Sequence, residues 1–129
     1  MKTRFRFFAV SIALLIVATS FTSTHGQDPD FKPPGTEEAA AVDRANGEID
    51  QVYKELMGKL DVKQQKSLRE AQRAWIKWRD AEADFITRLG GAEGGSSFRV
   101  DYSNALLKLI KERTEVLSGY VRDANNGDD

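Results

Sequence analysis

The sequence predicts an all-α fold, a small bundle of three helices that follows an N-terminal signal peptide. Residues 64–89 contain neither Pro nor Gly and are rich in good helix formers, so they are expected to form one long helix. Segments 36–60 and about 99–122 repeat apolar residues at the three- and four-residue spacing of amphipathic helices. Because a short connection joins the first two helices, we expect them to form an antiparallel hairpin.

The first 26 residues have the features of a secretory signal peptide. A positively charged start is followed by an apolar run, residues 7–18, that is too short to span a membrane. Cleavage fits after Ser20 or after Gly26, with Gly26 preferred, and an uncleaved anchor is the alternative. The sequence therefore predicts an exported protein, periplasmic or extracellular, without stable membrane insertion after cleavage.

The remaining chain divides into a linker, one domain and a tail. Residues 27–35 contain three prolines and a glycine, which predicts an extended linker. The helical domain is expected over residues 36–123, with a polar tail at 124–129. Without the leader, 16 of the 19 basic residues remain against 20 acidic ones. This balance argues against nucleic acid or an anionic membrane surface as a partner and suits a basic partner.

Individual residues are expected to set the ends of the helices and to weaken one of them. Thr36 is the candidate N-cap of the first helix, and Asp61 is the candidate cap of the second. Gly47 weakens the middle of the first helix, so that helix is expected to be firm only after it. Gly90-Gly91 are natural stops for the second helix.

Polar residues share the apolar side of the second helix, where each needs a partner. Arg79 and Glu82 are three residues apart, and Arg113 lies on the apolar side of the third helix. We expect Glu82 to be shared by both guanidinium groups, in a structural polar network that also contains Gln72. If that pair is buried, Glu82→Ala is expected to cost about 3–5 kcal/mol. The alternative is that one end of the network opens onto the surface and binds a partner.

The two tryptophans are expected to be core aromatic residues with different surroundings. Trp75 lies at the centre of the apolar stripe of the second helix, whereas Trp78 lies at its edge. An edge tryptophan either covers the rim of the core or anchors an interface.

Residues 90–98 are expected to form a Gly-rich loop on the surface. No strand precedes the glycines and no Lys follows them, which excludes a phosphate-binding loop. A flexible connection is the simpler interpretation, and a partner-binding loop is the alternative. The residues that would make that contact are Glu93, Gly94, Gly95, Ser96 and Ser97.

The sequence does not predict an enzyme. It has no Cys, and its one His, His25, lies in the leader. Imidazole and thiolate chemistry are therefore missing from the expected domain. Asp80 and Asp84 are paired on the charged face of the second helix, where neighbouring basic residues can neutralise them. We expect no metal and no cofactor.

A family resemblance adds a function to this description. The pattern Gln72-x-x-Trp75-x-x-x-Arg79-Asp80-x-Glu82 resembles the lysozyme inhibitor LprI-like family. Gly94-Gly95-Ser96 and Arg113-Thr114-Glu115-x-Leu117 follow in the order of that family, and the resemblance covers about residues 48–121. It is identified as a variant without cysteine, since the family usually carries Cys where this chain has Ala83 and Ala105.

The resemblance implies a non-enzymatic binding protein that blocks a lysozyme-type muramidase by protein–protein contact, with the 90–98 loop as the contact surface. It also implies that a bridge between the second and third helices has been given up. The alternative function is a structural or stress-related module that binds another envelope protein and has no lysozyme target.

Overall fold

The protein is all α-helical in the part of the chain that the computed structural model describes, residues 32–126. The three helices are α1 (Thr36–Lys59), α2 (Val62–Leu89) and α3 (Gly95–Asn126). The predicted fold class and the order of its elements are confirmed. The expected signal peptide, most of the linker, and residues 127–129 of the tail lie outside the described residues.

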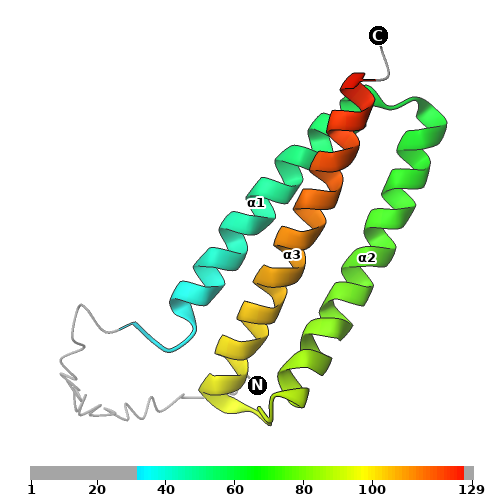
Figure 1. Cartoon of the computed structure of the whole chain (residues 1–129). Coiled ribbons are helices and arrows are strands. Elements are labelled where there is room, and N and C mark those ends of the chain that lie inside the picture. The colour runs from blue at the N-terminus through cyan, green and yellow to red at the C-terminus, as the bar shows by residue number, and fades with distance from the viewer. Residues whose placement is uncertain (1–31, 127–129) are drawn as a thin grey trace, which may run out of the picture. The chain divides into compact units, whose positions relative to one another are not determined.

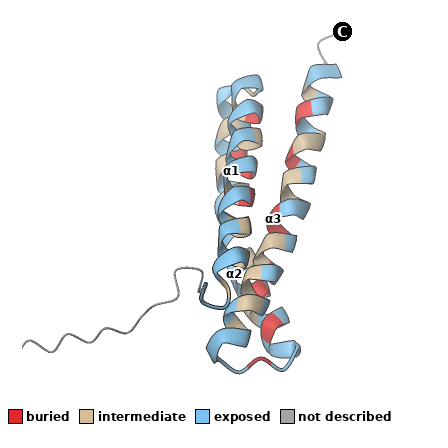
Figure 2. Cartoon of the chain, turned by 90° about the vertical axis from the view of Figure 1, so that its left-hand side faces the viewer, coloured by how far each residue is buried: buried red, intermediate tan, exposed pale blue. Residues whose placement is uncertain are grey.

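Helix α3 lies between α1 and α2 in the view of Figure 1 and to one side of both in the view of Figure 2. It packs most extensively on α1 and less extensively on α2, whereas the backbones of α1 and α2 come close at few points and their side chains meet in the core. Because α2 returns against both neighbours, α1 and α3 run in the same direction (Figure 1). The expected antiparallel hairpin of α1 and α2 is therefore correct in direction, but the two helices are joined chiefly through α3.

The core has one main cluster and one small cluster. The main cluster joins all three helices and contains Ala45, Ile49, Leu56, Leu68, Ile110, Leu117 and Val121. The small cluster joins α2 to α3 and contains Ala83, Ala105 and Leu109. Figure 2 shows the buried positions as a stripe along the inner side of each helix, as amphipathic packing requires. The larger share of the apolar burial thus lies between α1 and α3.

The start of α1 corrects two expectations. Gly35, not Thr36, is the N-cap residue, with φ of 90°, and no side chain caps the helix. The Thr36 hydroxyl instead donates a hydrogen bond to the Pro33 carbonyl at 2.7 Å. The helix is also continuous through Gly47, because Ala45 and Ile49 on either side are buried against the core. Tertiary packing outweighs the cost of one helical glycine, about 1 kcal/mol.

The junction of α1 and α2 is fixed by hydrogen bonds of three polar side chains, Asp61, Gln64 and Gln65. Asp61 caps α2 as predicted, accepting a hydrogen bond from the Gln64 N–H at 2.8 Å. The Gln64 side chain accepts one from the Asp61 N–H at 2.9 Å, which completes a capping box. The Gln65 amide donates to the carbonyls of Met57 and Leu60 at 3.1 and 3.0 Å. It thereby satisfies carbonyls that the end of α1 leaves free.

The connection between α2 and α3 is shorter than expected. Helix α2 ends at Leu89, followed by Gly90 as predicted, but α3 begins at Gly95, not near Arg99. The rings of Phe98 and Tyr102, one turn apart, stack at 5.9 Å and support this additional turn. The helix also continues to Asn126, three residues past the expected end of the domain. The loop therefore comprises residues 90–94, and Gly95, Ser96 and Ser97 belong to α3.

Candidate binding surfaces

A polar and aromatic cluster links α2 to α3 near the middle of the bundle. The Arg113 guanidinium donates a hydrogen bond from Nε to Gln72 Oε1 at 3.2 Å. It also lies over the Trp75 ring, 5.9 Å from the centroid, while Arg79 lies over the same ring at 5.3 Å. All four side chains are half-buried. A cation above an aromatic face is attracted to the ring quadrupole, so this cluster orients α2 on α3.

The expected role of Glu82 in this cluster is wrong. Arg79 pairs with Asp80 at 2.7 Å, and none of the ion pairs within residues 32–126 contains Glu82. Helical side chains lean toward the amino terminus of their helix, and Arg79 accordingly extends back over Trp75. Glu82 lies about one turn after Arg79, toward the carboxyl end of α2, whereas Arg79 extends toward the amino end. It is half-buried, and its carboxylate is free to meet a partner.

The core assignment of Trp78 is also wrong. Trp75 packs against the main core cluster, but Trp78 is 51% exposed. Phe85, Ile86 and Leu89, which follow on the same helix, are exposed as well. The face that α2 turns to α3 in this half carries the small residues Ala83 and Thr87, both buried. Small side chains let two helices approach closely, and the large apolar residues are left outside.

The loop end of the bundle has a fixed shape. The Thr87 hydroxyl donates to the Ala83 carbonyl at 2.7 Å, and the Thr87 carbonyl accepts from the Ala92 N–H at 3.3 Å. Ala92 is buried, which anchors the loop, whereas Glu93 and Gly94 are exposed. Gly94 and Gly95 have φ of 157° and 76°. Gly95, and Gly91 with φ of 86°, are in the left-handed region that favours glycine.

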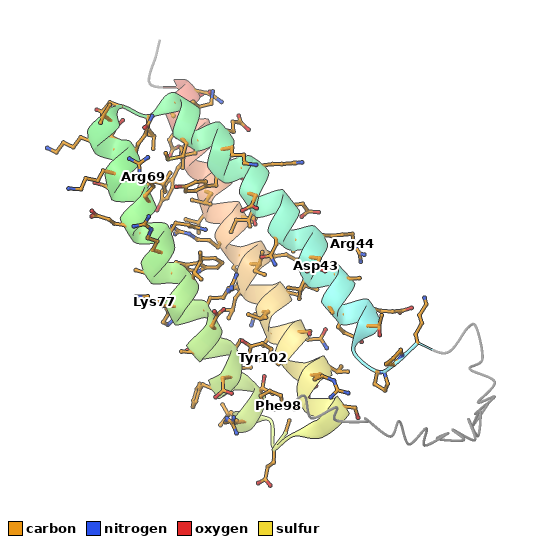
Figure 3. The ribbon with its side chains drawn as sticks, turned by 180° about the vertical axis from the view of Figure 1, so that it is seen from behind. Asp43, Arg44, Arg69, Lys77, Phe98 and Tyr102 are labelled. Atoms are coloured by element: carbon orange, nitrogen blue, oxygen red, sulfur yellow. The ribbon has the colours of Figure 1, made fainter. Side chains whose placement is uncertain are left out.

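Charge and aromatic contacts meet beside this loop. The Arg88 guanidinium lies 5.4 Å from the Phe98 ring centroid and forms an ion pair with Asp84 at 2.8 Å. The hydrogen bond from Arg88 lowers the pKa of the Asp84 carboxyl and raises the pKa of Arg88. Burial is the main cause that raises the pKa of the Tyr102 hydroxyl, and the nearby Asp80 carboxylate adds to it. Figure 3 shows Phe98 and Tyr102 at this end of the bundle.

The two halves of α2 carry opposite charge. From residue 80 to residue 101, the chain has five acidic residues, Asp80, Glu82, Asp84, Glu93 and Asp101, and two basic ones, Arg88 and Arg99. From residue 62 to residue 79 it has one acidic residue, Glu70, and six basic ones, Lys63, Lys66, Arg69, Arg73, Lys77 and Arg79. Figure 3 shows Arg69 and Lys77 on that basic half. The loop end is therefore the acidic pole of the molecule.

Between residues 32 and 126, no group of three or more His, Cys, Asp or Glu side chains is placed to hold a metal ion. No helix of the same range has the length and apolar character needed to cross a bilayer. Shallow depressions lie along the seams between helices, one of them lined by Trp75, Trp78 and Val116. The class of protein that the fold defines is a small bundle of three helices.

A comparison of the sequence with models of known protein families identifies the family of this chain. The family model for the lysozyme inhibitor LprI matches residues 37–117, from the first turn of α1 to the buried Leu117 of α3. The chain belongs to that family. No curated protein and no solved structure matched the chain.

Proposed function

We propose that this protein is exported and binds a lysozyme-type muramidase, which it inhibits by covering the cleft of the enzyme. Membership of the lysozyme inhibitor LprI family is the observation that carries the proposal. The positive and apolar segments at the start of the chain support export. The protein itself acts by contact and performs no chemistry.

The acidic pole supports a basic partner. Glu93 is exposed at the tip of the loop, and Gly94, Gly95, Ser96 and Ser97 are exposed beside it. Because the loop is anchored by the buried Ala92, these groups are held in place before binding. A preorganised contact loses less conformational entropy than a flexible one when the complex forms. We infer that the loop end enters or borders the cleft of the muramidase.

The test is inhibition of cell-wall lysis by a lysozyme, with binding measured in parallel by calorimetry. The wild-type chain is expected to slow lysis, and Glu93→Lys is expected to weaken both readouts at low salt. The matched control is Glu55→Lys, which reverses an exposed carboxylate on α1. If lysis proceeds at the uninhibited rate and no binding heat is seen, the protein is not a lysozyme inhibitor. The alternative of an envelope module with another partner then takes its place.

A further inference from the structure

Three large apolar side chains form an exposed line on α2. Trp78, Phe85 and Leu89 are 51, 57 and 75% exposed. They are separated by seven and four residues, so they lie on one face of the helix. We call these three residues the α2 ridge. Single exposed apolar residues are ordinary, but several large ones on one face of a helix mark an interaction surface.

The α2 ridge continues across the seam onto α3. Val116 is 43% exposed, and it lines the same shallow depression as Trp78 and Glu112. At the other end, Leu89 borders the loop that begins at Gly90. The apolar surface therefore extends from the middle of the bundle to its acidic pole. It is continuous with the loop contact proposed above.

Carboxylates border this apolar surface. Glu82 follows Trp78 by four residues and precedes Leu89 by seven, so it shares their face of α2. It is half-buried, and no ion pair within residues 32–126 includes it. Glu112 is bound only loosely, to Lys108 at 4.0 Å. Arg113 lines the same depression, but its guanidinium is engaged with Gln72 and the Trp75 ring. An apolar centre with an acidic edge is complementary to a protein surface that presents Arg or Lys around an apolar centre.

The same charges disfavour a second copy of this chain as the occupant. In a two-fold symmetric contact, the same surface is used by both copies. Such a contact through the α2 ridge would bring two copies of Glu82 and of Glu112 into one interface. Like charges placed together in this way oppose association. A basic partner instead gains from each carboxylate.

We propose that the α2 ridge and Val116, bordered by Glu82 and Glu112, form the docking surface for a basic protein. The inference rests on the proposed function, because it takes that partner to be the lysozyme-type muramidase. Trp78 is the central contact: half of its surface is already covered, and its free face can stack on a guanidinium group of the partner. Glu82, one turn away, can bind the same cation.

The experiment measures binding of the purified full chain to a lysozyme by calorimetry. Trp78→Ser and Phe85→Ser are each expected to raise the Kd at least tenfold, as loss of an interface hot spot does. The matched control is Ile76→Ser. Ile76 is 40% exposed on α2 but lies two residues from Trp78, on the opposite flank. Its Kd is expected to change less than twofold. Circular dichroism and thermal melting check that each variant is folded.

The charge of the surface is tested by salt. Glu82→Gln is expected to raise the Kd several-fold at low salt and to reduce its dependence on ionic strength. The control is Glu70→Gln, an exposed carboxylate in the basic half of α2. Equal effects of both changes would mean that only net charge matters, and would overturn the role of Glu82.

The outcomes separate the two proposals. If the wild type binds, Glu93→Lys weakens binding, and the serine variants bind like the wild type, the loop contact stands and the docking surface is refuted. If the wild type does not bind a lysozyme at all, the proposed function fails. Analytical ultracentrifugation adds one further outcome. A wild-type dimer that Trp78→Ser converts to a monomer would show that a second copy occupies the α2 ridge, which would also refute the inference.

Discussion

Replacement of Arg113 by alanine is expected to destabilise the bundle by about 2 kcal/mol. The hydrogen bond from its charged Nε to Gln72, 3.2 Å long, contributes about 1.5 kcal/mol. This is the low end for a charged donor, because Gln72 is half-exposed and can bond to water instead. The contact with the Trp75 ring at 5.9 Å adds about 0.5–1 kcal/mol.

The assay is urea unfolding followed by tryptophan fluorescence, with the slope of the transition compared between variants. Arg122→Ala is the matched control, since Arg122 is exposed on α3 and belongs to no ion pair within residues 32–126. It is expected to change the free energy of unfolding by less than about 0.5 kcal/mol. Removal of the Glu82 side chain is expected to cost less than about 1 kcal/mol, because it breaks no ion pair.

The opposite ranking would refute this reasoning. If Glu82→Ala costs about 3 kcal/mol or more and Arg113→Ala less than about 0.5 kcal/mol, a buried carboxylate holds the helices together. That is the arrangement expected from the sequence, and α2 would then have to be rotated relative to α3. A double variant, Arg113→Ala with Gln72→Ala, tests the same point. Its loss in free energy of unfolding should be about 1 kcal/mol smaller than the sum of the losses in the two single variants.

Three further outcomes are expected. Leu117→Ala should lower the free energy of unfolding by about 3 kcal/mol, because Leu117 is fully buried where α1 and α3 meet. Cysteines at Ala83 and Ala105 together should form a bridge on oxidation, detected by loss of free thiols. That bridge should stabilise the fold by about 3 kcal/mol over either single cysteine variant. The Asp84 carboxyl should titrate by NMR below the ordinary aspartate pKa, and Arg88→Ala should restore the ordinary value. Its contribution to stability is present at neutral pH and is lost as the pH falls through the lowered pKa.

The helices and most of their ends could be predicted because local chemistry determines them. Asp61 caps α2 through its own side chain, and Gly90 ends the helix, since each acts on residues next to it in sequence. The first turn of α3 was missed because Phe98 was assigned to the loop by the glycines and serines before it. The signal that could have found this turn is the four-residue spacing of Phe98 and Tyr102, which brings their rings together on a helix.

The identity of the core residues of α2 could not be predicted from periodicity alone. Periodicity gives the direction of an apolar stripe but does not say how closely the neighbouring helix approaches. In this structure, α3 packs on Ala83 through Ala105, and the adjacent ridge residues point to solvent. The sequence does contain a signal for this second face: Trp78, Phe85 and Leu89 keep helical spacing among themselves. Helix α2 therefore has two apolar faces, and the bundle covers only one of them.

Ala83 and Ala105 lie in the part of the α2–α3 contact that supports the proposed docking surface. Both alanines, which stand where the resemblance implies cysteines, are buried in the same small cluster and pack closely. That packing supports the half of α2 that carries the α2 ridge, while the larger core lies between α1 and α3. A partner that binds the α2 ridge adds contacts to α2, the helix with the less extensive packing. Any ligand that prefers the folded protein stabilises the fold, and the stabilisation grows with the logarithm of the ligand concentration. Binding at this surface should therefore raise the melting temperature of the chain, and it should do so at least as much in the variant with the Ala83–Ala105 bridge, because a helix that is already fixed loses less conformational entropy on binding.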